Sequence, residues 1–416
     1  MKIGNSALIL IPVIFGLSMA YFYDKGSLSF NGFQSKLKSS DSAKVLVSDV
    51  SYGEELESIL NLYEEIYQEE SEKFENKITD KWGEYKSSSK DQWVSYVENG
   101  NIRRTVNYKT GEINVEMQLP NMAMVPKNVT NKMEKEIFGL LSSSEADAFL
   151  ADEVAQNVEK RLPENHRMIK RGKPSENHLF DIDELSGISF NHSGFITVSS
   201  KTRYVAHTKV KKSALPGQVI VQSRLKIKKE VLRKAIQYAD SVQQASKKQN
   251  ISSALIYAIM ESESSFNPLA KSHVPAYGLM QIVPRSAGLD ATKHLYGRQK
   301  ILAPSYLYST DNNIKIGTAY LHVLYYKYLS RVKDPQSRVY CAIAAYNTGA
   351  SNVARAFIKQ KNFNRAVKRI NNMSSDQVYK ALVKRLPFRE TRKYVKKVTK
   401  NMNKYIVVAN GNHEVI

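Results

Sequence analysis

Cysteine is almost absent from the sequence: Cys341 is the only one among 416 residues. A single cysteine cannot form a disulfide within the chain, and metal sites built from several thiolates are excluded. Because Cys341 lies in the apolar run Val339-Tyr340-Cys341-Ala342-Ile343, we expect it to be a small buried side chain.

Acidic residues are also in short supply, with 40 Asp and Glu against 61 Lys and Arg, which gives a formal net charge of +21. Residues 355–404 hold sixteen Lys and Arg and two acids, whereas residues 41–80 hold twelve acids and three Lys. A basic C-terminal segment favours an anionic partner. Zinc-finger spacings, RNP patterns and basic zippers are all missing, so no nucleic-acid partner is expected.

The remaining composition is ordinary for a globular protein, with 42% hydrophobic and 24% charged residues. It excludes collagen, wholesale disorder and a polytopic membrane protein. No repeat of solenoid length is present. The length suits two domains, each with enough apolar residues for a core.

The N-terminus carries an apolar run over residues 7–23, preceded by Lys2. The run is long for the core of a signal peptide and short for a membrane-spanning helix. We interpret residues 1–25 as a signal peptide or a membrane anchor, and both interpretations place the rest of the chain outside the cytoplasm. The Ser- and Lys-rich residues 26–50 are interpreted as a linker.

Two regions of different character follow, with a boundary near Ile227. Residues 51–227 mix helical and alternating apolar patterns, which predicts an α+β domain. Its expected helices span residues 54–83, 131–141 and 144–161, and its expected strands residues 102–108, 112–117 and 219–227. Residues 228–416 predict an all-α domain, with helices over residues 252–264, 312–329, 336–347 and 389–405.

Two acids lie near the end of the first of these C-terminal helices, which Pro268 terminates. Glu263 lies three residues after Met260 and four after Ile259, on the apolar face, whereas Glu261 points elsewhere. Burial makes an ionised carboxyl costly, so its pKa should rise, which suits a general acid for a glycosidic bond. The helix pattern alone also fits a structural acid that is hydrogen-bonded to nearby backbone.

Four short motifs occur in order along the second region. They are Glu263-Ser-Ser-Phe-Asn-Pro268, Gly278-Leu-Met-Gln281, Ala345-Tyr-Asn-Thr-Gly349 and Glu390-Thr-Arg-Lys-Tyr394. Together they resemble the catalytic domain of the soluble-type lytic transglycosylases, a family with a goose-lysozyme-like fold. The resemblance covers residues 231–405. Within it, stretches such as Gly317-Thr-Ala-Tyr-Leu321 are similar to the membrane-bound lytic murein transglycosylase C branch.

The resemblance implies a fold and a set of site residues. The fold would be an α+β N-terminal domain followed by an all-α lysozyme-like (goose-type) catalytic domain. Glu263 would be the catalytic residue, with no metal ion and no organic cofactor. The substrate-binding residues would be Ser272, Gly278, Met280, Gln281, Tyr346, Asn347 and Tyr394.

The implied reaction cleaves the β-1,4 bond between N-acetylmuramic acid and N-acetylglucosamine in peptidoglycan without water, leaving 1,6-anhydromuramyl ends. Glu263 would serve first as acid and then as base. The implied partners are peptidoglycan glycan strands and, through the N-terminal segment, the membrane, on the periplasmic side of a bacterial envelope. Two alternatives remain open: a lysozyme-like hydrolase on the same fold, and a non-catalytic wall-binding scaffold.

The chain departs from the family's pattern at three places. Ser309-Thr310 stand where the family usually has Asp-Pro, and Pro275 stands where glycine is common. Both leave loop conformation and subsite preference open. The branch's lipid-attachment cysteine is missing after the apolar run, which leaves open how the chain is attached to the membrane.

We expect the apolar run over residues 7–23 to be retained as an anchor. The mature protein should then begin at or near Met1 and resist extraction from membranes by salt and by alkaline carbonate. N-terminal sequencing checks this expectation. A mature chain that begins at Tyr21 would show instead that Ser18-Met19-Ala20 is a cleavage site.

Overall fold

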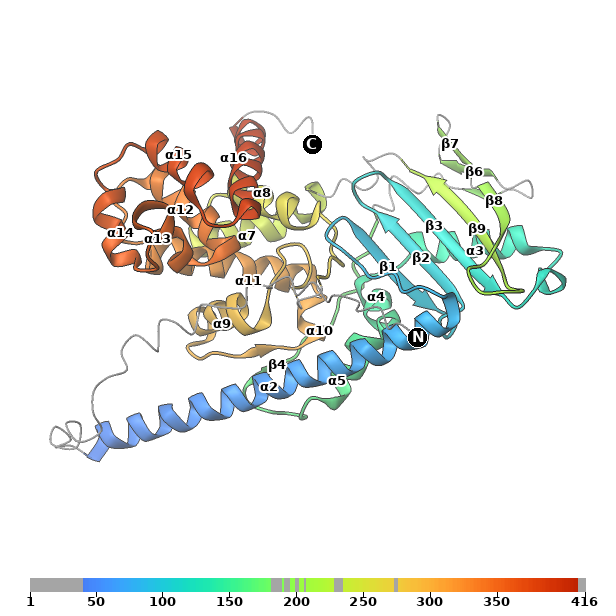
Figure 1. The fold of residues 1–416 in the computed structure, drawn as a ribbon, viewed down its shortest axis with the longest axis horizontal. Helices are drawn as coiled ribbons and strands as arrows, with labels where there is room; N and C mark the ends of the chain where they lie inside the picture. The colour runs from blue at the N-terminus through green and yellow to red at the C-terminus, as the bar shows by residue number, and fades with distance from the viewer. Residues whose placement is uncertain are drawn as a thin grey trace, which may run out of the picture.

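The structure is a computed structural model that describes residues 40–180, 189–190, 195–198, 202–205, 207–227, 235–272 and 276–410 (Figure 1). It combines an N-terminal region that contains the sheets with a helical C-terminal region. The apolar run over residues 7–23 and the departure at Pro275 lie outside the described residues. No helix in the described part of the chain has both the length and the apolarity needed to cross a membrane.

The N-terminal region is organised around a five-stranded antiparallel sheet. Its strands, in spatial order, are β1 (Gln92–Val97), β2 (Ile102–Asn107), β3 (Glu112–Leu119), β9 (Val219–Lys226) and β8 (His207–Lys212). A second, three-stranded sheet contains β5 (Ser189–Phe190), β6 (Phe195–Val198) and β7 (Thr202–Val205). The helices are α2 (Ser40–Trp82), η3 (Met122–Met124), α3 (Val129–Leu141), α4 (Glu145–Ala151) and α5 (Glu153–Arg161).

Helices cover both faces of the five-stranded sheet. Alternating side chains such as Ile113 and Val115 of β3 pack in one core with Met133 and Ile137 of α3. On the opposite face, a smaller core contains the C-terminal end of α2, including Trp82. The expected hairpin of residues 102–117 is confirmed, with Ile102 opposite Met117 in the register.

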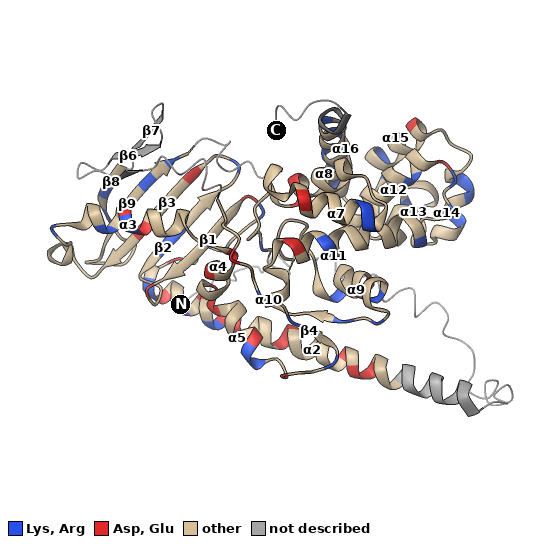
Figure 2. Cartoon of the chain, turned by 180° about the vertical axis from the view of Figure 1, so that it is seen from behind, with Lys and Arg blue, Asp and Glu red and all other residues tan. Residues whose placement is uncertain are grey.

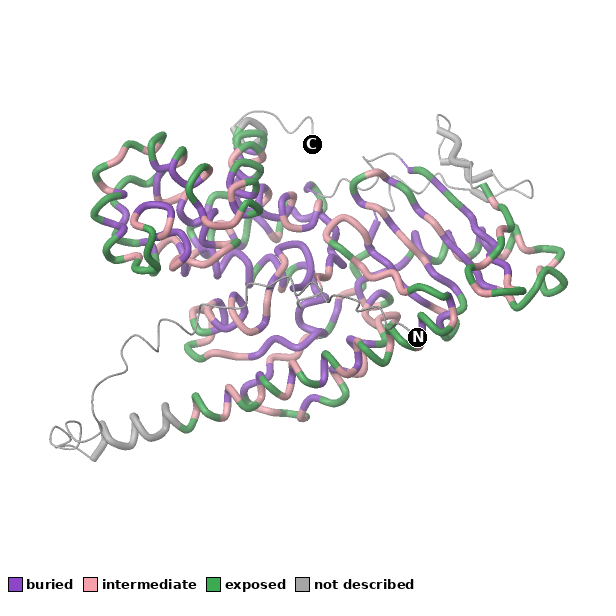
Figure 3. The backbone as a smooth tube through the Cα atoms, viewed as in Figure 1, coloured by how far each residue is buried: buried purple, intermediate pink, exposed green. Residues whose placement is uncertain are grey.

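The C-terminal region is a set of helices around a single core (Figure 3). Its elements are η4 (Ile236–Tyr238), α7 (Ala239–Gln249), α8 (Ser253–Ser264), the π-helical η5 (Pro284–Gly288), α9 (Leu289–Tyr296), β10 (Ile301–Leu302), α10 (Pro304–Leu307), α11 (Thr310–His322), the π-helical η6 (Val323–Tyr328), α12 (Pro335–Thr348), α13 (Ala350–Ile358), α14 (Phe363–Ile370), α15 (Ser375–Arg385) and α16 (Arg389–Asn410). Cys341 is fully buried on α12, as its apolar surroundings predict.

The long helix α2 joins the two regions. Its middle part contributes Leu60 and Tyr63 to the core of the helical region, and the Tyr63 hydroxyl lies 3.0 Å from that of Tyr277. Several positions along α2 are acidic (Figure 2), and one acidic residue of this helix, Glu64, accepts a 2.9 Å bond from Arg285. Because its other end, at Trp82, packs on the sheet, α2 holds the sheet against the helical region.

Several boundaries differ from those expected. The helix α2 begins at Ser40, so its first turns overlap the end of the segment 26–50 that was interpreted as a linker. Residues 144–161 form two helices because the Asp152 carboxylate accepts the Ala155 N–H and starts a new helix there. The single helix expected over residues 312–329 is observed as α11 followed directly by the π-helical η6. The strands β1 and β8 were not predicted.

A second connection between the regions lies near β4 (Ile169–Lys170), which pairs in parallel with β10. There Lys271 places its ammonium 3.2 Å from Asp152 and over the ring of Tyr67. The Tyr308 hydroxyl donates to the same carboxylate. Asp152 therefore caps α5 and anchors the segment that follows α8.

Replacing Lys271 by Met should lower the free energy of unfolding by roughly 1–3 kcal/mol, because the pair is partly buried and its loss leaves Asp152 without a cation. Urea denaturation measures the change. A matched control is Lys380→Met, which removes an exposed helical pair with Asp376. The control should cost about 0.5 kcal/mol or less. Equal losses in the two variants would contradict a special role for the pair of Lys271 and Asp152.

Candidate active site

The helix α8 ends abruptly next to Glu263. The following residues Ser265 and Phe266 both have a left-handed backbone, with φ of 51° and 62°, and Pro268 follows closely. Left-handed backbone is uncommon for residues other than glycine and is usually maintained by surrounding contacts. Here the Ser264 hydroxyl donates to Leu279 O at 2.9 Å, so the helix end is bonded to the loop that contains Gly278.

The Glu263 carboxyl is partly exposed at this helix end. Burial raises its pKa, while the positive charge of Lys90, a hydrogen-bonding interaction with Tyr394 and the charge of Lys397 oppose the rise. The nearby charge of Glu390 adds to the rise, and the net direction is upward. A carboxyl group with a raised pKa retains its proton closer to neutral pH, which is the property a general acid needs.

Two tyrosines lie beside this carboxyl. The hydroxyl of Tyr394 is buried and makes no hydrogen bond of normal geometry with any residue that the structure describes, although its interaction with Glu263 contributes to the pKa of the acid. The hydroxyl of Tyr346 donates to Met280 O at 2.8 Å, and its ring lies 5.4 Å from that of Tyr320. Burial, followed by the charge of Glu263, raises the pKa of both hydroxyls well above the ordinary value, so both stay protonated.

The neighbouring acid Glu261 has a different environment. Its carboxylate lies 3.3 Å from the ammonium of Lys404 and accepts a 2.9 Å bond from the Tyr405 hydroxyl. Both partners belong to α16. Glu261 therefore joins α8 to α16, whereas Glu263 has no ion pair among the described residues. This separation follows the helical spacing seen in the sequence.

The loop over residues 276–282 carries three of the expected binding residues. Gly278 has φ of 72°, and a Cβ atom there would lie 2.4 Å from the Asn313 amide nitrogen. That amide donates to Tyr277 O at 2.8 Å, and its oxygen accepts the Met280 N–H at 2.9 Å. The Gln281 amide nitrogen donates to Gly278 O at 3.1 Å within the loop, to Ala276 O at 3.4 Å at its start and to Ala270 O at 3.0 Å before it, which makes it a loop-forming group.

The structure assigns no role in the site to two further expected residues, Ser272 and Asn347. The Ser272 backbone N–H donates to Ala276 O at 3.3 Å. Asn347 is exposed near the end of α12, one residue after Tyr346. Both therefore stay predictions as substrate-binding residues.

The departure from the family's pattern at Ser309-Thr310 has its own hydrogen bonds. Ser309 caps α11 by accepting the Asn312 N–H. The Thr310 hydroxyl donates to the buried carboxylate of Glu145 at 2.5 Å. This contact gives the N-terminal region another bond to the helical region, at the start of the helix that holds Asn313.

Sequence reasoning missed Lys90 and Lys397 as neighbours of the acid. Lys397 was assigned to the basic C-terminal segment, and its ammonium lies 3.4 Å from the carbonyl oxygens of Glu261 and Ser262. Its position one helical turn after Tyr394 could have indicated that Lys397 lies near Glu263. Lys90 belongs to the N-terminal region, and no spacing in the sequence relates it to Glu263.

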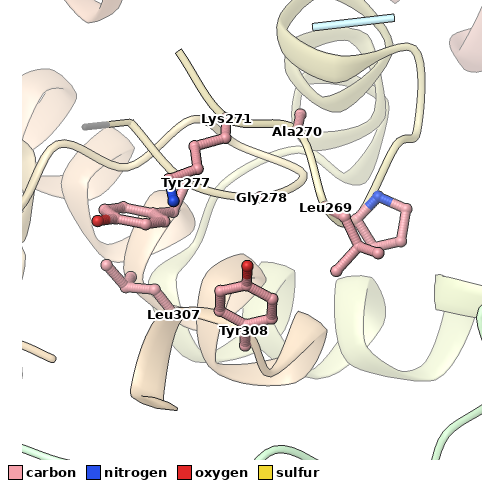
Figure 4. A pocket seen from close by; sticks show the side chains of 8 residues that line it. Leu269, Ala270, Lys271, Tyr277, Gly278, Leu307 and Tyr308 are labelled. Atoms are coloured by element: carbon pink, nitrogen blue, oxygen red, sulfur yellow. The ribbon is translucent and has the colours of Figure 1, made fainter. Parts of the chain in front are cut away.

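A pocket lies beside the loop that contains Gly278 (Figure 4). Its lining includes Lys271, Tyr277 and Tyr308, but not Glu263. Lys271 and Tyr308 both bond Asp152, so the polar groups of this pocket already have partners in the protein. Among the residues that the structure describes, no cluster of His, Cys, Asp and Glu has the arrangement to hold a metal ion.

Comparison with known families and curated proteins identifies relatives. The transglycosylase SLT domain family matches residues 240–368. The membrane-bound lytic murein transglycosylase C of Pectobacterium atrosepticum is 31% identical over 335 residues, which are 80% of this chain and 88% of the relative. That of Sodalis glossinidius is 44% identical over 173 residues, which are 42% of this chain and 48% of the relative. The chain thus matches about half the length of some curated relatives and most of another.

Among solved structures, the 70 kDa soluble lytic transglycosylase of Escherichia coli is similar at 28% identity and a TM-score of 0.32, covering 42% of this chain and 24% of that chain. A complex of a 70 kDa soluble lytic transglycosylase with bulgecin A is similar at 27% identity and a TM-score of 0.33. It covers 42% of this chain and 25% of that chain.

Replacing Gly278 by Ala should destabilise the protein in two ways. A left-handed backbone costs an L-residue about 1–2 kcal/mol, and the overlap with Asn313 should add about 1–3 kcal/mol. The control Gly297→Ala has φ of 77° but open space around the new Cβ, so it should show the first cost alone. Urea denaturation compares the two variants. If both lose the same stability, close packing of Gly278 on Asn313 does not constrain the loop.

Proposed function

Because the chain belongs to the membrane-bound lytic murein transglycosylase C family, we propose that it cleaves the glycan strands of peptidoglycan with Glu263 as its single acid and base. The observation that carries the proposal is the environment of this carboxyl: a raised pKa, two protonated tyrosine hydroxyls beside it and no ion pair among the described residues. Glu261, two residues away, is bonded to Lys404 and lacks this environment.

In the first step, the protonated Glu263 donates to the oxygen that links N-acetylmuramic acid to N-acetylglucosamine. The glycosidic bond breaks, and the 2-acetamido group of the muramic acid stabilises the positive charge at C1. The buried hydroxyl of Tyr394 supports this step, because it is a donor without another partner of normal geometry. It can hydrogen-bond the carboxylate that forms as the proton leaves.

In the second step, the Glu263 carboxylate accepts the proton of the muramyl 6-hydroxyl, and the oxygen attacks C1. The products are an N-acetylglucosamine end and a 1,6-anhydromuramyl end. No water is consumed, and the acid is returned to its protonated form. One carboxyl group suffices because proton donation and proton acceptance occur in succession at the same face of the sugar.

The membership of this family also supports a proposal for the fold. We propose that residues 228–416 form a goose-type lysozyme-like catalytic domain and that residues 51–227 form an N-terminal domain. The loop residues Gly278, Met280 and Gln281, together with Tyr346, Asn347, Ser272 and Tyr394, would line the glycan cleft. The bond from Tyr346 to Met280 O supports a common wall built from α12 and this loop.

We further propose that the protein acts at the periplasmic side of a bacterial envelope and is held at the membrane by its N-terminal segment. Its curated relatives are named membrane-bound. The basic residues of α13 to α16 would help to retain the anionic polymer, and salt should screen this attraction.

Glu263→Gln should abolish the release of anhydromuropeptides from purified sacculi, because the amide can neither donate nor accept the required proton. General acid–base participation contributes about 10²–10⁴-fold. Glu261→Gln should retain most of the activity, since Glu261 bonds α16. Mass spectrometry of the released muropeptides measures both variants, and comparable losses in the two would reject the assignment.

The same measurement separates the alternatives. A hydrolase would release products heavier by one water than the anhydro products. A two-carboxylate hydrolase would also need a second acid, and Glu390 is the other carboxylate whose charge reaches Glu263. It is exposed in the first turn of α16, so Glu390→Gln should leave most activity intact. No muropeptide release by the unchanged protein would favour a wall-binding scaffold.

A further inference from the structure

A tight turn precedes β1 in the N-terminal region and carries Lys90. The Ser89 N–H donates to Gln92 O at 2.7 Å, which closes the turn. The Ser88 hydroxyl donates to Val94 O at 3.1 Å and accepts the Val94 N–H at 2.9 Å. Lys90 therefore lies within a short segment whose backbone is held by the sheet.

The turn is bonded to the end of α8 on both sides of Lys90. The Ser265 hydroxyl donates to the Asp91 carboxylate at 2.6 Å, and the Asn267 amide donates to Ser89 O at 3.4 Å. Since consecutive Cα atoms lie about 3.8 Å apart, these bonds fix Lys90 beside the residues that directly follow Glu263. β1 is an edge strand of the sheet, and Figure 1 shows this edge turned towards the helical region.

Two cations thus lie near the acid from different elements. Lys90 is half-buried and forms no ion pair with any described carboxylate. Lys397 of α16 donates to the carbonyl oxygens of Glu261 and Ser262 and forms no ion pair with a carboxylate that the structure describes. Burial, followed by the charge of Lys90, lowers the pKa of Lys397.

We propose that Lys90 is a positioning residue of the active site: the N-terminal region supplies its ammonium across the interface to stabilise the charged form of Glu263. This inference rests on the proposed function of Glu263 as acid and base. Lys90 acts through Glu263 and need not touch the sugar.

The charge of Lys90 has a role in a mechanism with one carboxyl group. Burial favours the protonated acid, which aids the first step but hinders the release of the proton and the basic second step. A nearby cation offsets part of this preference. The groups that act on Glu263 are Lys90 in the turn, Tyr346 on α12, and Glu390, Tyr394 and Lys397 on α16.

The test measures the pKa of the Glu263 side chain in the full-length protein by carbon-13 NMR titration, with the signal assigned by its loss in Glu263→Gln. Lys90→Met should raise this pKa, because the neighbouring cation is removed. Lys90→Arg keeps the charge and should stay near the unchanged protein. The control Lys86→Met removes a cation from the same loop that pairs with Glu84, and it should have no effect.

The pH dependence of the activity on sacculi provides a second measurement. The general acid must be protonated, so kcat/KM falls as pH rises through the pKa of Glu263. Lys90→Met should therefore shift the basic limb of the profile to higher pH and lower kcat at neutral pH, whereas Lys90→Arg should restore both. Ser265→Gly removes the hydroxyl that binds Asp91 at a left-handed position glycine tolerates. It should shift the pKa in the same direction as Lys90→Met.

Two outcomes would overturn the inference. One is a Glu263 pKa that is the same in Lys90→Met and Lys86→Met. The other is an unchanged pKa together with a raised KM for sacculi, which would make Lys90 a binding group for a substrate carboxylate. The NMR titration needs no turnover, so it decides the role of Lys90 even if the unchanged protein releases no muropeptides.

Discussion

The end of α8 is the point on which the candidate site depends. The proposed role requires Glu263 to be at the surface, where a polymer could reach it, and its carboxyl to be sufficiently enclosed to retain a proton. The chain achieves both by ending the helix with two left-handed residues, Ser265 and Phe266. Such backbone persists only where surroundings hold it. Here Leu279 O binds Ser264, Asp91 binds Ser265, and α16 packs along the helix.

The contacts that enclose this point come from both regions of the chain. The loop around Gly278 and the helices α12 and α16 are contributed by the helical region, while the turn with Lys90 is contributed by the sheet-containing region. The long helix α2 and the hydrogen bonds of Asp152 and Glu145 hold the sheet-containing region and the helical region together. A carboxyl pKa responds to charges within several ångströms. A small displacement of one region relative to the other would therefore change the pKa of Glu263.

The acid and its neighbour Glu261 illustrate how environment separates two identical side chains. An ion pair and a tyrosine hydroxyl satisfy Glu261, so its carboxylate contributes to the attachment of α8 to α16. Glu263 instead lies beside two protonated tyrosine hydroxyls and near the positive charges of Lys90 and Lys397, with no ion pair among the described residues. A group left so poorly satisfied lowers stability, and proteins retain such groups mainly at functional sites.

The sequence by itself determined most local elements and singled out Glu263 as the candidate acid. The alternation of Ile113, Val115 and Met117 specified a strand, and helical spacing placed Glu263 and Glu261 on different faces, because both periods are properties of the backbone. Tertiary structure alone decided the extent of α2, the new helix at Asp152, the internal bonding of Gln281 and the presence of Lys90 beside the acid. These features depend on contacts between residues far apart in the chain, and such contacts leave no periodic signal in the sequence.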